Sequence, residues 1–221
     1  MKTKQTGFTL VEIAIVLVII GLLLGGILKG QEMIAQAKIK NVINDLNGVM
    51  AAMNSYQDRY RAIPGDDKGA NARWTLTNEQ GDGNGSIAGK YNTTTATEES
   101  ALFWRHLRLA GFVSGTGWEQ PFNAVSGKMG VQTGDSVLAA GAYGPVLATG
   151  TTVSGYTGLI LCSANMPDKI AISVDSQTDD GNATTGSVRA GVGGGNIDVP
   201  PASSPYVEDG TKSYLVCRTL I

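Results

Sequence analysis

The chain has 221 residues, a formal net charge of −2 and 30 glycines. A nearly neutral chain without a long basic block lacks the electrostatic footprint of a nucleic-acid-binding protein, so nucleic acid is not expected as a leading partner. The length after the apolar N-terminal run suits one further domain with its own core, and a second domain is not required.

An apolar run covers residues 8–28 and follows a short stretch that contains Lys2 and Lys4. As a helix the run is about 30 Å long, which matches the hydrocarbon core of a bilayer. Lysines before the first apolar run hold that end in the cytoplasm, so the rest of the chain is predicted to be extracytoplasmic. The alternative is a cleaved secretory signal peptide, although its apolar stretch is usually shorter.

Glu12 is the only charged residue within this run. A lone carboxylate at membrane depth costs roughly 2–3 kcal/mol or more unless a partner neutralises it. We consider two interpretations: Glu12 pairs with a positive charge, or it lies close enough to the end of the span for its side chain to reach water.

The helical pattern continues beyond the apolar run. Apolar residues recur at alternating spacings of four and three: Ala35, Ile39, Val42, Leu46, Val49, Met53, Tyr56 and Tyr60. This stripe predicts an amphipathic helix that continues to Arg61 and is stopped by Pro64 and Gly65. Two G-x-x-x-G spacings in the run, Gly21 to Gly25 and Gly26 to Gly30, either permit close helix approach in lipid or reflect common membrane composition.

The tract Gly7-Phe8-Thr9-Leu10-Val11-Glu12, with its basic leader and apolar continuation, resembles the N-terminus of the type IV pilin-like proteins. This family includes pilins, minor pilins and the pseudopilins of type II secretion. The resemblance implies that prepilin peptidase cuts after Gly7 and that the new N-terminal Phe8 is methylated. It also implies that Glu12 pairs with the new amino group of a neighbouring subunit, which would relieve both burial costs.

The expected function is therefore a structural subunit of a type IV pilus-like filament or a type II secretion pseudopilus. The partners implied are prepilin peptidase, other pilin or pseudopilin subunits and an inner-membrane assembly platform. The alternative is a binding module, displayed on a filament or anchored in the membrane, for adhesion, an exported protein or DNA. Many filament-forming members carry a proline near the end of the membrane segment, and its absence between Phe8 and Pro64 favours a low-abundance subunit.

The expected fold is α+β, with a long N-terminal helix packed on a small antiparallel sheet, as in pilins. The predicted regions are a leader (residues 1–7), a transmembrane segment (8–28), an amphipathic helix (29–62) and an extracytoplasmic globular domain (63–221). The protein is expected in the bacterial inner membrane as a single-pass chain. No catalytic constellation is recognised, because a Ser-His-Asp triad would need His106, the only histidine, and no serine stands in a nucleophile-elbow sequence.

Two acidic segments are candidate calcium sites. In "NEQGDGNGSIAG", Asp82, Asn84 and Ser86 alternate as the oxygen ligands of a calcium loop do, although Gln80 stands where the first carboxylate belongs. Glu98 or Glu99 can supply further charge. The alternative interpretation is an Asn-Gly turn without Ca²⁺. Later in the chain the acidic residues are Asp175, Asp179 and Asp180, which can bind calcium or form a turn before Gly181.

Residues 97–110 are predicted as a short helix that Thr97 or Ser100 caps and Gly111 ends, with His106 as a packing residue. The segments PGD (64–66), FWRHL (103–107) and DDG (179–181) together resemble a subgroup of pseudopilin-like proteins. Three strands are predicted, at 159–162, 170–174 and 214–217. Cys162 and Cys217 end two of them and are expected to form a disulfide in an oxidising compartment, the alternative being a buried thiol pair.

Overall fold

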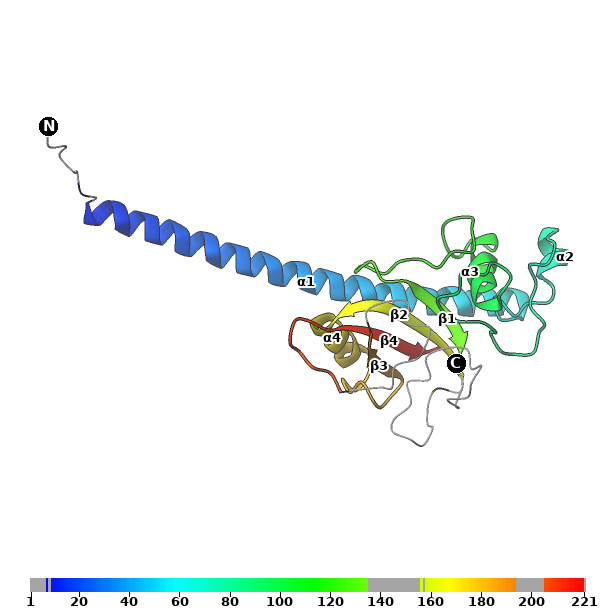
Figure 1. Cartoon of the computed structure of the whole chain (residues 1–221). Coiled ribbons are helices and arrows are strands. Elements are labelled where there is room, and N and C mark those ends of the chain that lie inside the picture. Colours follow the sequence, from blue (N-terminus) through cyan, green and yellow to red (C-terminus); the bar gives the residue numbers. More distant parts are fainter. Residues whose placement is uncertain (1–6, 8, 135–155, 157, 194–204, 221) are drawn as a thin grey trace. The chain divides into compact units, whose positions relative to one another are not determined.

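The computed structural model describes residues 7, 9–134, 156, 158–193 and 205–220. The helices are α1 (Leu10–Tyr60), α2 (Ala70–Trp74), α3 (Glu99–Leu109) and α4 (Asp168–Thr178), and the strands are β1 (Met129–Thr133), β2 (Leu159–Pro167), β3 (Val188–Val192) and β4 (Ser213–Thr219) (Figure 1). The chain divides into two units, Met1–Lys38 and Ile39–Ile221, which we call the stem and the head. The predicted α+β fold, a long N-terminal helix with a small antiparallel sheet, is confirmed.

The second half of α1 belongs to the head because it buries its apolar stripe there. Its buried residues are Ile39, Val42, Leu46, Val49, Ala52, Met53 and Tyr56, which include six of the eight stripe positions. The helix stops at Tyr60, since Arg61 adopts a left-handed conformation (φ 54°) and donates its N–H to the carbonyl of Gln57 at 2.8 Å. The predicted amphipathic helix is therefore confirmed, to within one residue of its predicted end.

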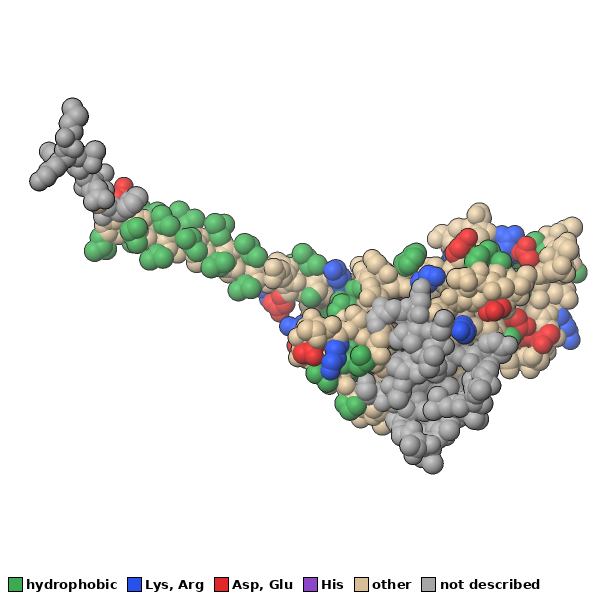
Figure 2. All heavy atoms as spheres, viewed as in Figure 1, with side chains coloured by type: hydrophobic (Ala, Val, Ile, Leu, Met, Phe, Trp, Pro, Cys, Tyr) green, Lys and Arg blue, Asp and Glu red, His purple; other side chains and the backbone are tan. Residues whose placement is uncertain are grey.

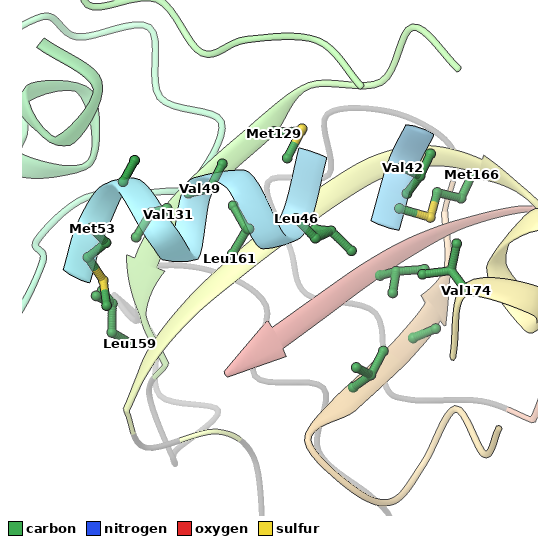
Figure 3. Packing of buried hydrophobic residues seen from close by; sticks show 14 of the residues in the cluster. Val42, Leu46, Val49, Met53, Met129, Val131, Leu159, Leu161, Met166 and Val174 are labelled. Atoms are coloured by element: carbon green, nitrogen blue, oxygen red, sulfur yellow. The ribbon is translucent and has the colours of Figure 1, made fainter. Parts of the chain in front are cut away.

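The sheet has the strand order β1-β2-β4-β3, and all three neighbouring pairs are antiparallel. Alternate residues of each strand point to opposite faces. Leu161 and Val216 join the cluster that contains the stripe of α1, whereas Cys162 and Cys217 lie in a second cluster. Figure 3 shows Val49 of α1 beside Val131 and Leu161 of the sheet, Met53 beside Leu159, and Val42 beside Met166.

The strand predicted at 170–174 is wrong, because this segment lies inside helix α4. Ile170, Ile172 and Val174 alternate with smaller residues and so imitate a strand pattern. The helix nevertheless buries Ile170, Ala171 and Val174, whose spacing follows a helical period. The strands predicted at 159–162 and 214–217 are confirmed as parts of β2 and β4.

Helix α3 confirms the helix predicted before Gly111, but its start differs from the prediction. Glu98 is the residue at the N-cap, and its side chain makes no capping hydrogen bond. Neither Thr97 nor Ser100 therefore caps the helix. Instead, the N–H groups of Ala101 and Leu102 both bond to the carbonyl of Glu98 at 2.9 Å.

Candidate functional site

One buried carboxylate organises the loop in which the first calcium motif lies. Asp66 is only 5% exposed, and its two oxygens accept the backbone N–H groups of Gly83, Asn84 and Gly85 at 2.6, 3.0 and 2.7 Å. Glu99 at the start of α3 accepts the N–H groups of Asp82 and Ala88 at 3.0 and 2.8 Å. Burial raises the pKa of the Glu99 carboxyl, although these two bonds oppose the rise.

The candidate calcium ligands lie on this loop. Asp82 approaches Asp66 and Glu99, so that one carboxylate oxygen of each lies within 4.8 Å of the others. The side chain of the exposed Asn84 instead bonds within the loop: its amide nitrogen donates to Asp82 at 2.9 Å, and its Oδ1 accepts the N–H of Ser86 at 2.7 Å. The loop is thus held by carboxylate-to-backbone bonds, and calcium binding at Asp82, Asn84 and Ser86 stays a prediction.

The second acidic group has the same construction. Asp175, Asp179 and Asp180 also bring one oxygen each within 4.8 Å of the others. Asp175 accepts the hydroxyl of Tyr206 at 2.7 Å, and Asp179 accepts the N–H of Val188 at 2.8 Å. Asp180 accepts the N–H of Asn182 at 2.9 Å. These carboxylates connect the end of α4 to β3 and to the segment that contains Tyr206.

His106 is fully buried, and both of its ring nitrogens bond to backbone groups. The N–H of Gly65 donates to Nδ1 at 2.9 Å, so that Nδ1 must be the acceptor and Nε2 the protonated nitrogen, which lies 2.8 Å from the carbonyl of Glu79. Burial lowers the pKa of His106. Its imidazole also stacks on Tyr56 with 6.3 Å between ring centroids. Through these two bonds His106 connects the segments that contain Gly65 and Glu79 to α3.

Cys162 and Cys217 form a disulfide, as expected. They are direct partners in the register of β2 and β4, so the bond links adjacent strands of the sheet. It lies in the cluster with Tyr91, Tyr156 and Leu215 rather than in the one that contains α1.

At the N-terminus of α1, Glu12 forms a capping box with Thr9. The backbone N–H and the hydroxyl of Thr9 both bond to Oε2 of Glu12 at 2.8 Å, and the N–H of Glu12 lies 3.3 Å from the Thr9 hydroxyl. Among the described residues, the other carboxylate oxygen, Oε1, has no hydrogen-bond partner. These bonds with Thr9 fix the orientation of the carboxylate.

The stem presents its apolar side chains to the surroundings. Between Leu10 and Ile34 the exposed large apolar residues are Leu10, Val11, Ile13, Ile15, Val16, Leu17, Val18, Ile19, Ile20, Leu22, Leu23, Leu24, Ile27, Leu28, Met33 and Ile34 (Figure 2). Of the described helices, α1 alone is long and apolar enough to cross a membrane, and its most apolar stretch is not buried against the protein. A signal sequence passes the same test, so the motif around Glu12 must distinguish the two.

Residues 2–28 match the model of the prokaryotic N-terminal methylation motif. The chain carries the type IV pilin-like prepilin signal. The match includes Gly7, Phe8 and Glu12, and it supports a protein that prepilin peptidase processes and that assembles with other pilin subunits. The chain has no match among curated proteins or among solved structures.

Of the three residues singled out in the prepilin signal, the structure describes two, Gly7 and Glu12. Gly7 is exposed and precedes the helix, Glu12 lies in the first turn of α1, and Phe8 lies outside the described residues. Thr9 is a residue that the sequence analysis missed, although the spacing Thr-x-x-Glu before an apolar run is the signal of a capping box. Asp66 was also missed, because its three bonding partners lie far along the chain.

Proposed function

We propose that the chain is a structural subunit of a type IV pilus-like filament or a type II secretion pseudopilus. Prepilin peptidase cuts it after Gly7, and the subunits assemble through α1. The observation that supports this most directly is that Oε1 of Glu12 has no hydrogen-bond partner among the described residues, while the side chains around it on the helix are apolar and exposed. A cationic amino group at Phe8 of a neighbouring subunit would neutralise this carboxylate in lipid.

We further propose that the chain crosses the bacterial inner membrane once, with its N-terminus in the cytoplasm and its head outside. Lys2 and Lys4 precede the apolar run, and such a flank stays cytoplasmic. The disulfide between Cys162 and Cys217 fits an oxidising, extracytoplasmic compartment. The proposed regions remain a leader (1–7), a transmembrane segment (8–28), a helix continuation (29–62) and a globular domain (63–221).

Substitution of Glu12 by glutamine separates the charge of this residue from its capping role. Glutamine keeps the capping box with Thr9, but it cannot neutralise an amino group. We expect Glu12→Gln to be inserted and cut as the wild type is, and to be incorporated into filaments or secretion complexes much less. Incorporation is measured as the fraction of the chain that sediments with sheared filaments or cross-links to neighbouring subunits in membranes.

Two further variants make this test specific. Glu32→Gln removes another exposed carboxylate of α1, which pairs with Lys29 at 2.7 Å, and should assemble normally. Glu12→Ala removes both the cap and the charge and should assemble no better than Glu12→Gln. If Glu12→Gln assembles like the wild type and only Glu12→Ala fails, the carboxylate serves the cap alone and the proposed pairing is wrong.

A further inference from the structure

The head has a hollow between α1 and the segment that follows α3. Its volume is about 310 Å³, at the lower end of the range of about 300–1,000 Å³ for ligand pockets. Its apolar lining includes Val49, Trp104, Phe112, Phe122 and Met129. Val49, Trp104 and Met129 are buried, whereas Phe122 is 65% exposed. The hollow therefore leads from the core of the head to an aromatic ring at its surface.

Three polar residues line the same hollow. Asn44 and Asp45 are neighbours on α1, and Ser114 belongs to the segment after α3. Within the described residues the side chains of Asn44 and Ser114 make no hydrogen bond. Burial raises the pKa of the Asp45 carboxyl, and the backbone N–H of Ala124, its one donor among the described residues, opposes the rise. A carboxylate accepts up to about four hydrogen bonds, so most of the capacity of Asp45 is unused.

Trp104 adds an unused donor to this lining. It is fully buried, and its indole N–H has no acceptor among the described residues. A buried polar group without a partner is unfavourable. A ligand that fits the hollow therefore brings donors for Asp45, an acceptor, and an apolar surface for Phe122.

These requirements exclude several classes of ligand. The described lining contains no lysine, arginine or histidine, so an anion would face Asp45 without a compensating charge. An ammonium group has donors but no acceptor, and a hydrocarbon has neither. A peptide backbone offers one N–H per residue, whereas adjacent hydroxyl groups of a sugar donate to both oxygens of one carboxylate. The same hydroxyl groups also accept, and the C–H face of a sugar ring packs on an aromatic ring.

We propose that the hollow binds a neutral saccharide, whose C–H face packs on Phe122 and whose adjacent hydroxyl groups donate to Asp45. Asn44 and Ser114 bond to further hydroxyl groups, and the indole N–H of Trp104 donates to a sugar oxygen. This inference goes beyond the proposed function, because it gives the head a ligand of its own and needs no second subunit.

Calorimetric titration of the purified full-length chain tests this binding. The probes are cellobiose and N,N′-diacetylchitobiose, which are both neutral disaccharides. The chain is kept in dodecylphosphocholine, because a detergent with a sugar headgroup would compete for the hollow. We expect saturable binding of one molecule per chain for at least one of the two probes.

Three variants locate the binding in the hollow. Asp45→Ala should raise the Kd about tenfold or more, since hydrogen bonds to a charged group are lost. Phe122→Ala should raise it about fivefold through loss of the aromatic face. Gly48→Leu should abolish binding, because a Cβ at Gly48 meets nothing in its own chain and the side chain would enter the hollow. The matched controls Asp58→Ala and Ala51→Leu, on exposed parts of α1 outside the lining, should bind like the wild type.

Circular dichroism of each variant checks that the head is folded. Absence of saturable binding of both disaccharides to the wild type, or binding that Gly48→Leu leaves unchanged, would overturn the proposal. Binding of a blocked apolar dipeptide in place of the sugars, abolished by Gly48→Leu, would make the hollow a peptide site and would equally overturn it. Filament assembly is measured separately with Glu12→Gln, so failure of sugar binding leaves the proposed function untouched.

Discussion

Asp66 stabilises the head through a single carboxylate that accepts three backbone N–H groups. Asp66→Ala would remove the buried acceptor that these three donors share, and only water could replace it. We expect it to lower the free energy of unfolding by about 3 kcal/mol or more, because each hydrogen bond to a charged group contributes about 1.5–3 kcal/mol. Urea unfolding of the full chain in detergent, followed by tryptophan fluorescence, measures the change.

The matched variant for this prediction is Asp82→Ala, on the same loop. Asp82 is exposed, and within the described residues its side chain bonds only to Asn84, so its loss should cost about 1 kcal/mol or less. Equal destabilisation by the two variants would show that Asp66 has no special role in holding the loop.

His106 makes the head sensitive to acid. Its Nδ1 accepts the N–H of Gly65, so a proton on Nδ1 would break this bond, and burial already lowers the pKa of the folded state. The unfolded chain therefore takes up the proton first as the pH falls. Stability from this group is complete above about pH 6.5 and decreases below it, by up to about 1.4 kcal/mol per pH unit until the pKa of the folded state is reached.

The variant His106→Asn isolates this contribution to the pH dependence. Asparagine keeps an acceptor near the position of Nδ1 but does not titrate. We expect the loss of stability between pH 7.5 and pH 5.5 to be smaller in His106→Asn than in the wild type. An identical loss in both proteins would assign the pH dependence to other groups.

At the scale of the elements, the disulfide ties β2 to β4 across the middle of the sheet. The double variant Cys162→Ser/Cys217→Ser opens a loop of 55 residues. In the chain-entropy model this lowers the free energy of unfolding by about 4 kcal/mol. Urea unfolding with and without reductant measures the effect: reductant should lower the stability of the wild type and leave the variant unchanged. A wild type insensitive to reductant under unfolding conditions would contradict the prediction.

Sequence analysis predicted those helices and strands whose residue pattern is complete within one short stretch of the chain. The stripe of α1 and the apolar runs of β2 and β4 carry their own period, so sequence analysis predicted them. In α4, Ile170, Ile172 and Val174 alternate as in a strand, whereas Ile170 and Val174 also fit the period of a helix. The segment forms a helix that buries these two residues and packs against the sheet. Strands β1 and β3 were not predicted, since each is short and contains a glycine, Gly130 or Gly191.

The same distinction applies to the candidate site. Glu12 was found because a charge within an apolar run stands out without any structure. The role of Asp66 depends on Gly83, Asn84 and Gly85, which only the folded loop brings to it. The head also has a hollow beside Asp45, which sequence analysis could not predict because its lining comes from α1, α3, β1 and the segment after α3.

At the scale of the whole molecule, the stem and the head are built differently. The stem exposes an apolar helix that begins with the capping box of Thr9 and Glu12, and the head forms an α+β unit held by buried carboxylates and one disulfide. The prepilin signal covers residues 2–28 and therefore lies in the stem. Assembly is accordingly expected to require the stem.

The mature N-terminus of the protein tests the central claim most directly. Mass spectrometry of the chain purified from the membrane fraction should find a polypeptide that begins at N-methylated Phe8 and retains the rest of the stem. A chain that still begins at Met1, or one cut beyond Leu28, would contradict processing as a pilin-like subunit.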